Sequence, residues 1–315
     1  MPTIPARLDR RSFLAAAAAL TATAAHAAQP FFKRTGLPLG IQLYTLGPDA
    51  AKDLDGTLKG LADIGYKTVE LAGLLGRTPA QMRASLDKAG LSAPSAHIQP
   101  RGGEGTLDSD LGKLAEGLNT IGAKTAVMPI LYIPDRFGPP KAGEGFGAYL
   151  QRVGAGLTAD DWKMNADFLN AKAKGLQAGG IRLGYHNHNF EFAPVGSTTG
   201  LEILLANTDP ALVTFEMDIG WVAAAGADPL ALLKRHKGRF TLMHIKDIKA
   251  DTKPNFAFQM DPAEIGAGKL DWKTLLPAAY GEGVRHFYVE QEPPFTRPRI
   301  EAAKISHDYL ASVVA

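Results

Sequence analysis

Short segments rich in β-branched residues alternate with longer amphipathic segments from Leu37 to the end of the chain. This alternation is typical of βαβ units and predicts a parallel sheet. The predicted strands are residues 40–44, 68–72, 92–98, 125–130, 182–188, 214–219, 241–247 and 286–292. The predicted helices are residues 52–64, 78–89, 107–121, 159–178, 201–206, 229–237, 271–280 and 297–314. Eight strands, each followed by a helix, indicate an α/β protein.

Residues that end and begin helices support these boundaries. Gly65, Gly90 and Gly122 each follow a helical pattern as C-terminal caps, and Asp228 precedes a proline as an N-terminal cap. Eight units that close on themselves form a single-domain (β/α)8 TIM barrel. An open doubly wound sheet more often carries a glycine-rich dinucleotide loop after its first strand, and none follows Tyr44.

Two connections are longer than the usual loop of such a fold. Residues 131–157 are rich in glycine, proline and aromatic residues, and residues 248–270 contain two phenylalanines. Long ordered loops in compact domains often cover active sites. Because both connections follow a strand, we expect them to lie over the active-site face of the barrel. The alternative is that both are tolerated surface insertions.

The N-terminal segment has the features of an export signal. Arg10 and Arg11 precede an alanine-rich apolar run, which ends in a small-x-small cleavage site at Ala27. The twin arginine and weakly apolar run resemble a Tat signal, so we expect residues 1–27 to be a cleaved signal peptide, residues 28–36 a linker and residues 37–315 the barrel. The mature protein would then be periplasmic or extracellular, with no membrane association. An uncleaved N-terminal anchor helix is the alternative.

The composition excludes several other classes of protein. A chain of 315 residues with 45% hydrophobic residues fits one globular α/β barrel. Removal of residues 1–27 takes three of the 34 basic and one of the 32 acidic residues, leaving 31 of each. A neutral chain lacks the basic surface of a nucleic-acid binder. The absence of cysteine excludes disulfides, thiolate metal sites and cysteine nucleophiles.

The last four predicted strands end in ionisable side chains, and alternate residues of a strand share a face. The pairs on one face are His186 with His188, Glu216 with Asp218, His244 with Lys246, and Glu290 with Glu292; Glu191 lies just beyond the first pair. Barrel interiors are normally apolar, so buried charges need a compensating partner. One divalent cation, Mn, Co, Fe, Zn or Mg, would suit these carboxylates and imidazoles. Salt bridges to Lys246 or Arg182 are the structural alternative.

These segments together resemble the xylose isomerase-like barrel superfamily of sugar isomerases and epimerases, which also contains sugar dehydratases and lyases and the AP endonuclease relatives. The resemblance covers the mature chain. It rests on the segments Ile41-Gln42-Leu43-Tyr44, Thr68-Val69-Glu70-Leu71, His186-Asn187-His188-Asn189-Phe190-Glu191-Phe192, Met217-Asp218-Ile219-Gly220-Trp221, His244-Ile245-Lys246-Asp247, Gly266-Ala267-Gly268-Lys269-Leu270-Asp271-Trp272 and Val289-Glu290-Gln291-Glu292.

The resemblance implies a single metal held by residues of strands five to eight. The last three ligands fall on Asp218, His244 and Glu290. Members of the superfamily often have glutamate at the fifth-strand position, where this chain has His186. Either His186 is itself the ligand, or the chain turns back to present Glu191.

The resemblance also implies chemistry at a carbon next to a carbonyl, with the metal stabilising an enediolate. The candidate bases are Glu191, His188 and Glu290, and Lys246 would stabilise the oxyanion or protonate a leaving group. The residues expected to line the substrate pocket are Gln42, Glu70, His97 and Trp221.

The expected function is therefore an exported, metal-dependent sugar isomerase or epimerase. A keto-sugar lyase or dehydratase on the same site is the close alternative, because the same enediolate can expel a β leaving group. A non-catalytic carbohydrate-binding barrel is a third interpretation. A phosphodiesterase of the AP endonuclease kind would need two or three zinc ions and a basic groove, which the neutral charge opposes. The expected partners are a sugar or sugar derivative and the Tat machinery, and the aromatic loops permit a homodimer.

Overall fold

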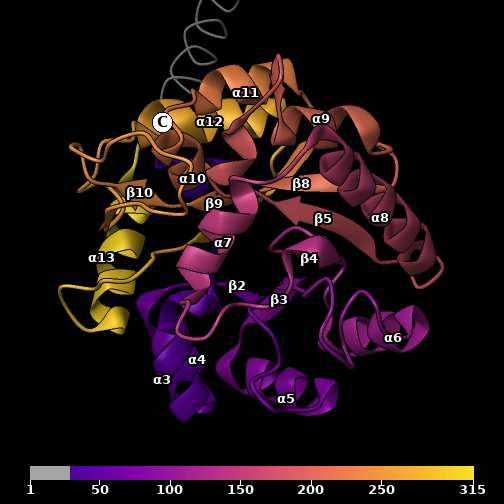
Figure 1. Ribbon diagram of the computed structural model, residues 1–315. Helices are drawn as coiled ribbons and strands as arrows, with labels where there is room; N and C mark the ends of the chain where they lie inside the picture. The colour runs from indigo at the N-terminus through magenta and orange to yellow at the C-terminus, as the bar shows by residue number, and fades with distance from the viewer. Residues whose placement is uncertain (1–28) are drawn as a thin grey trace, which may run out of the picture.

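The computed structural model describes residues 29–315. Eight strands close into a barrel in the order β1-β12-β9-β8-β5-β4-β3-β2, and every neighbouring pair is parallel (Figure 1). The barrel strands are β1 (Leu39–Gln42), β2 (Thr68–Leu71), β3 (Ser92–His97), β4 (Thr125–Met128), β5 (Arg182–His186), β8 (Val213–Asp218), β9 (Phe240–Ile245) and β12 (His286–Val289). The predicted (β/α)8 barrel is confirmed.

Helices surround the barrel. They are α2 (Phe31–Thr35), α3 (Gly47–Lys52), α4 (Leu54–Ile64), α5 (Pro79–Ala89), α6 (Leu111–Ile121), α7 (Phe146–Gly154), α8 (Ala159–Gln177), α9 (Gly200–Asn207), α10 (Ile219–Ala224), α11 (Pro229–Arg235), α12 (Trp272–Glu282) and α13 (Arg299–Ser312). Short 3₁₀ turns are η1 (Leu43–Leu46), η2 (Asp135–Phe137) and η3 (Phe190–Phe192), and two small hairpins are β6 (Pro194–Val195) with β7 (Thr198–Thr199) and β10 (Asp247–Ile248) with β11 (Pro262–Ala263).

The predicted caps have the expected geometry. Gly65, Gly90 and Gly122 end α4, α5 and α6. The side chain of Asp228 accepts hydrogen bonds from the first backbone N–H groups of α11. Each predicted strand, however, runs one to three residues past its observed end. The reason is that the chain leaves the barrel there: α10 starts at Ile219, directly after β8.

Helices α2 and α7 lie where the sequence predicts only a linker or a loop, and the six-residue helices α3 and α10 also fall largely between predicted elements. Helix α2 falls in the predicted linker 28–36, and its Phe31 and Phe32 are buried in edge-to-face contact with Phe287 of β12. Helix α7 falls in the predicted loop 131–157. It is only nine residues long and follows a segment rich in glycine and proline, which obscures its helical pattern.

The interior of the barrel has an apolar layer beneath a polar one. Val127, Leu242 and Tyr288 form an apolar cluster on inward-facing positions. His244 and Glu290 follow the last two of these by two residues, so they point to the same side. Intervening residues such as Met243 pack outward against the helices. The polar site thus rests on the filled core of the barrel.

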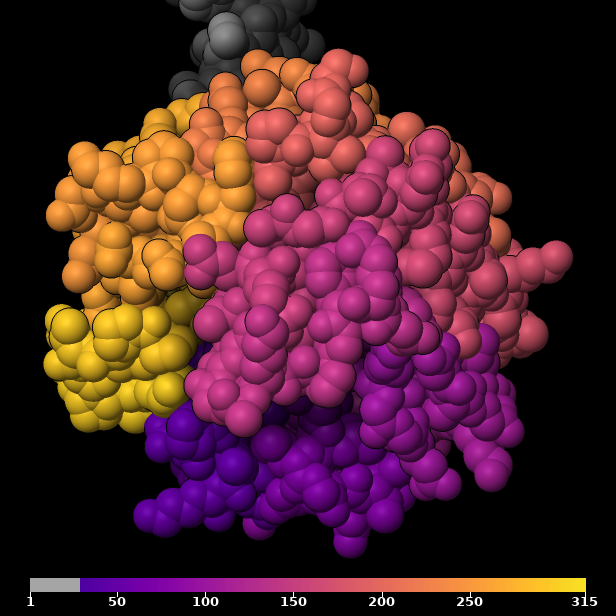
Figure 2. All heavy atoms as spheres, in the orientation of Figure 1, coloured from indigo at the N-terminus to yellow at the C-terminus, as the bar shows by residue number. Residues whose placement is uncertain are grey.

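Helix α7 and the segment after β10 cover the end of the barrel that carries this polar layer. In Figure 1, α7 crosses in front of the barrel strands, and in Figure 2 its residues fill the centre of this face. Phe146 of α7 contacts Phe258 of the second long connection, with ring centroids 6.2 Å apart. Phe258 in turn lies 4.9 Å from the ring of His188. Both long connections therefore lie over the predicted active-site face.

The predicted signal peptide, residues 1–27, lies outside the described residues. Within residues 29–315, no helix is both long enough and apolar enough to span a membrane.

Candidate metal centre

The strand ends bring an unusual number of ionisable side chains into the barrel. Those with no measurable exposure are Glu70, Glu216, Asp218, His244 and Lys246. His186 and Glu290 are buried to 2% and 5% exposure. Burial of charge at this density is costly unless the groups are paired with each other or with a metal ion. The distances between these side chains therefore show whether they pair with each other or could hold a metal ion.

Four of these side chains form a set that we call the outer set: His186, Asp218, His244 and Glu290. One donor atom from each lies within 4.8 Å of the others. The Oδ2 atom of Asp218 lies 3.9 Å from Nε2 of His186 and 3.7 Å from Nδ1 of His244. Bonds of about 2.0 to 2.2 Å place opposite donors up to about 4.4 Å apart. Two imidazoles and two carboxylates at this spacing fit a divalent cation.

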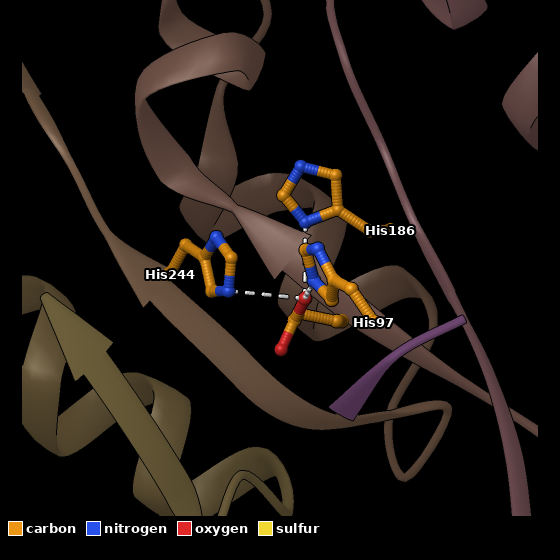
Figure 3. A group of neighbouring side chains, drawn as sticks. His97, His186 and His244 are labelled. Atoms are coloured by element: carbon orange, nitrogen blue, oxygen red, sulfur yellow. Dashed lines mark hydrogen bonds and ion pairs between the residues drawn. The ribbon is translucent and has the colours of Figure 1, made fainter. Parts of the chain in front are cut away.

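Two buried carboxylates lie behind the outer set. Glu70 Oε2 is 2.7 Å from His244 Nε2, and Glu216 Oε2 is 3.0 Å from His186 Nδ1. His97 also contacts Glu216, at 3.0 Å from its Nε2. Figure 3 shows the three imidazoles gathered around one point. His97, His186, Glu216 and His244 thus form a second cluster, which we call the inner set.

Glu216 and Glu70 orient the two imidazoles that both sets share, His186 and His244. A ring N–H donated to a carboxylate leaves the other ring nitrogen with its lone pair free for a metal. The contacts to Glu216 and Glu70 occupy Nδ1 of His186 and Nε2 of His244. The nitrogens that face the outer set are Nε2 of His186 and Nδ1 of His244, the second of which lies 2.8 Å from Glu290 Oε2. Such carboxylate–histidine pairs are typical of the surroundings of protein metal sites.

Lys246 lies among the outer carboxylates. Its Nζ is 2.8 Å from Asp218 Oδ2, 2.7 Å from Glu290 Oε2 and 3.1 Å from Glu292 Oε1. Burial lowers the pKa of Lys246, but Asp218 and Glu290 outweigh it and raise this pKa well above its ordinary value. Burial likewise opposes ionisation of Glu290, yet Lys246 and His244 hold its pKa well below the usual range. The site therefore contains an ammonium group in direct contact with Asp218, Glu290 and Glu292.

His186 has the properties of a neutral ligand. Burial, and then the positive charge of the neighbouring His244, lower the pKa of the His186 imidazole well below its ordinary value. A neutral imidazole can bind a metal without first losing a proton. Of the two fifth-strand candidates, His186 belongs to both the outer and the inner set, and Glu191 belongs to neither.

Glu191 faces away from the metal ligands. Its carboxylate accepts hydrogen bonds from the Tyr185 hydroxyl at 2.8 Å and from the backbone N–H of His188 at 2.9 Å. Tyr185 is on the outward face of β5, opposite His186. Burial raises the pKa of Glu191 to about 8. The structure therefore favours His186 over Glu191 as the fifth-strand ligand, because the η3 turn directs Glu191 back towards its own strand.

His188 lies beyond the end of β5 and beside the aromatic residues of the covering loop. Its ring is stacked against Phe190 and lies 5.4 Å from the ring of Trp221. The Nδ1 atom of His188 is buried and has no hydrogen-bond partner among residues 29–315. An unpartnered imidazole nitrogen can accept a proton, so His188 remains a candidate base.

Trp221 lines a cavity of about 680 Å³ next to the outer set, together with Tyr44, Phe258 and Glu292. The expected pocket residues Gln42, Glu70 and His97 are not on its wall. Gln42 donates to Glu70 at 2.9 Å, beneath the metal ligands. Glu70 contacts His244, and His97 contacts Glu216, so these side chains support other residues of the site instead.

Several residues at the site have no role that the sequence pattern reveals. The pattern along β8 identifies Glu216 only as the face partner of Asp218, although its position two residues earlier places it in the barrel. Glu292 contacts Lys246 and also lines the cavity. Phe258 is in a long loop without periodicity, so only the folded chain could place its ring against Trp221, 5.1 Å away.

Asp247 contacts residues 266–272, the glycine-rich segment that is one basis of the family resemblance. Its carboxylate accepts hydrogen bonds from the backbone of Gly266 and Leu270 and from the indole of Trp272. A Cβ atom on Gly268 would lie 2.0 Å from Asp247 Oδ1, so a glycine is required for this close approach. Asp247 thus anchors the loop after β9 rather than acting in the site.

The sequence matches the xylose isomerase-like TIM barrel family over residues 58–313. It is 30% identical over 207 residues to an inosose dehydratase of Geobacillus kaustophilus, an alignment that covers 62% of this chain and 63% of the relative. The match thus spans less than two thirds of the length of that curated relative.

Two solved structures extend the comparison over the whole barrel. A sugar phosphate isomerase/epimerase from Parabacteroides distasonis is 26% identical, with a TM-score of 0.67, and covers 89% of this chain and 95% of its own. The IOLI protein with a bound zinc atom is 14% identical, with a TM-score of 0.63 and coverage of 88% and 98%. At that identity the second likeness shows the fold alone.

Proposed function

Because the chain belongs to the xylose isomerase-like TIM barrel family, we propose that it is a metal-dependent dehydratase of a ketone that carries several hydroxyl groups. The outer set carries this proposal, since it places two imidazoles and two carboxylates around one point beside a cavity. The similarity to inosose dehydratases supports elimination of water as the reaction. The sequence-based expectation of isomerisation becomes the second candidate.

His186, Asp218, His244 and Glu290 would hold the metal. When bound, a divalent cation supplies Lewis acidity, which polarises a carbonyl oxygen and stabilises the negative charge that develops on it. The donor set suits Mn, Co, Fe, Zn or Mg. Glu70 and Glu216 orient the two imidazoles from behind through the contacts described above.

His188 is the proposed base. Its unpartnered Nδ1 would accept the proton from the carbon next to the carbonyl. Burial lowers the pKa of His188 well below its ordinary value, so the ring is neutral before the reaction. Phe258 and Trp221, which pack around this ring, exclude water from it.

Lys246 is the proposed acid. As the carbon–oxygen bond at the β position breaks, the departing hydroxyl takes a proton from Nζ and leaves as water. The lysine is held at the cavity by Glu292, which lies 3.1 Å from Nζ and lines the wall. The electron pair of the broken carbon–hydrogen bond becomes the new double bond conjugated to the carbonyl, so the atoms and charges balance.

The second candidate is an isomerase or epimerase, favoured by the similarity to the Parabacteroides distasonis protein over nearly the whole chain. The two reactions share the removal of the α-proton. They differ in its fate, since an isomerase or epimerase returns a proton to carbon and releases no water.

The test uses metal-loaded protein incubated with a panel of inososes and keto-sugars in deuterated water. A dehydratase gives a product lighter by one water. Deuterium at the α-carbon of an isomeric product, with no loss of water, would replace this proposal by the second candidate. Absence of both reactions from metal-loaded protein would contradict both candidates and favour a carbohydrate-binding barrel.

Two variants assign the roles. His188→Gln should lose proton removal while it still binds the metal, because His188 is in neither metal-binding set. Asp218→Asn should lose the metal and the activity together. Full activity of His188→Gln would transfer the role of base to another residue.

A further inference from the structure

His186 and Glu216 are direct neighbours across the barrel wall. They are register partners on the parallel strands β5 and β8. Both side chains point into the barrel, and His186 Nδ1 lies 3.0 Å from Glu216 Oε2. The acidic residue therefore sits at the same level as His186, one strand further round the barrel.

Glu216 is the common partner of three imidazoles. Its Oε2 atom lies 3.0 Å from His97 Nε2, 3.0 Å from His186 Nδ1 and 3.1 Å from His244 Nε2. Its Oε1 atom is buried and has no hydrogen-bond partner within the described part of the chain. All of the contacts of Glu216 within residues 29–315 thus go to the three imidazoles that surround the metal-binding position.

Glu216 adds negative charge behind the outer set, next to His186. The outer set contains two carboxylates, because His186 fills the position where the resemblance implies an acidic ligand. A carboxylate that accepts the N–H of a metal-bound imidazole makes that imidazole a stronger donor. Negative charge behind His186 also favours a cation in front of it at low dielectric.

We propose that Glu216 is a positioning residue of the metal centre, which supplies from behind His186 the negative charge that an acidic fifth-strand ligand would supply by direct contact. This inference rests on the proposed metal site of the preceding section and goes beyond it, because it concerns why a histidine can serve at this position.

The competing explanation is structural: Glu216 would only satisfy a buried N–H of His186. The substitution Glu216→Gln separates the two. The amide carbonyl of glutamine still accepts one hydrogen bond, but glutamine carries no charge. A merely structural role predicts unchanged metal affinity, whereas the proposal predicts a loss.

The experiment titrates Zn²⁺ and Co²⁺ into metal-free full-length protein and measures affinity by calorimetry and the Co²⁺ absorption spectrum. Glu216→Gln should weaken metal binding by about 10- to 100-fold, the usual effect of removing such a partner. The double variant His186→Glu with Glu216→Gln restores an acidic residue at the fifth-strand position. It should recover an affinity within about tenfold of the parent protein, with a changed Co²⁺ spectrum.

A matched control is Glu202→Gln, which removes a carboxylate that contacts His236 at 3.1 Å outside the barrel. It should leave metal affinity unchanged. Thermal denaturation of each metal-free variant checks the fold, and recovery by the double variant shows independently that the barrel has formed.

Two results would overturn the inference. The first is a Glu216→Gln variant that binds metal within about threefold of the parent protein. The second is a folded double variant that fails to recover affinity. If the parent protein binds no metal at all, the proposed function fails as well, so the two failures are distinguishable.

Discussion

Glu70 and His244 are 174 residues apart in the sequence, yet Glu70 Oε2 lies 2.7 Å from His244 Nε2 inside the barrel. The other nitrogen of the same ring lies 2.8 Å from Glu290 Oε2. His244 therefore joins a deeper carboxylate to a proposed metal ligand. The contact fixes both the orientation of the ring and the nitrogen that faces the outer set.

This relationship predicts the effect of Glu70→Gln. The amide accepts the His244 N–H less strongly, so metal affinity should fall by about 10- to 100-fold. The fold should remain, because the apolar layer beneath the site is untouched. Calorimetric metal titration checks the affinity and circular dichroism checks the fold. An unchanged affinity would show that Glu70 does not act through His244.

Asp218 has two separable tasks. Its Oδ2 faces the outer set, whereas its Oδ1 accepts the backbone N–H of Trp221 and caps α10. Asp218→Asn should therefore abolish activity and keep the cap, while Asp218→Ala loses both and costs about 1 kcal/mol more in free energy of unfolding. Urea denaturation of the two metal-free variants measures the difference. Equal stabilities would argue against the capping role.

Gly220 leaves room for Lys246. A Cβ atom at this position would lie 2.7 Å from the Cγ of Lys246. Gly220→Ala should displace the lysine, reduce turnover strongly and cost about 1 to 3 kcal/mol of stability through overpacking. Steady-state kinetics and thermal denaturation check both effects.

The matched control is Gly281→Ala in α12, where a Cβ atom meets nothing within 4 Å. It should keep full activity and stabilise the helix slightly. A Gly220→Ala variant as active as this control would show that the position of Lys246 is not critical.

Burial raises the pKa of Glu191 to about 8, from an ordinary value of 4.5. The folded protein therefore holds a proton that the unfolded chain releases at lower pH. The contribution of protonated Glu191 to the free energy of unfolding is fully present below pH 4.5 and is lost as the pH rises through about 8. The melting temperature of metal-free protein should accordingly fall across this range, and Glu191→Gln should flatten that slope. An identical slope in the variant would place the titrating group elsewhere.

The export signal remains a prediction from the sequence. Replacement of Arg10 and Arg11 by lysine should retain the protein in the cytoplasm, since twin arginines define the Tat route. Arg7→Lys, in the same charged region, is the control and should be exported normally. Fractionation followed by mass spectrometry of the N-terminus, expected at Ala28, checks both points. Export of the double-lysine variant would contradict the Tat assignment.

The sequence by itself determined the architecture, because hydrophobic periodicity and helix caps are local properties. Alternation along β8 and β9 also placed Asp218 and His244 on the inward face, and the positions of these residues at strand ends placed them at one end of the barrel. The periodicity of the sequence does not predict where side chains point once the chain has left a strand. Nothing in the fifth-strand segment distinguished His186 from Glu191 as a ligand.

Only the tertiary structure decided which nitrogen of each imidazole faces which carboxylate. The pairing of Glu216 with His186 follows from the register between β5 and β8, and the pairing of Glu70 with His244 spans the barrel. The contact of Phe258 with Trp221 depends on the path of a loop without periodicity. Register, barrel closure and loop packing are non-local, so no pattern within a single segment could reveal these contacts.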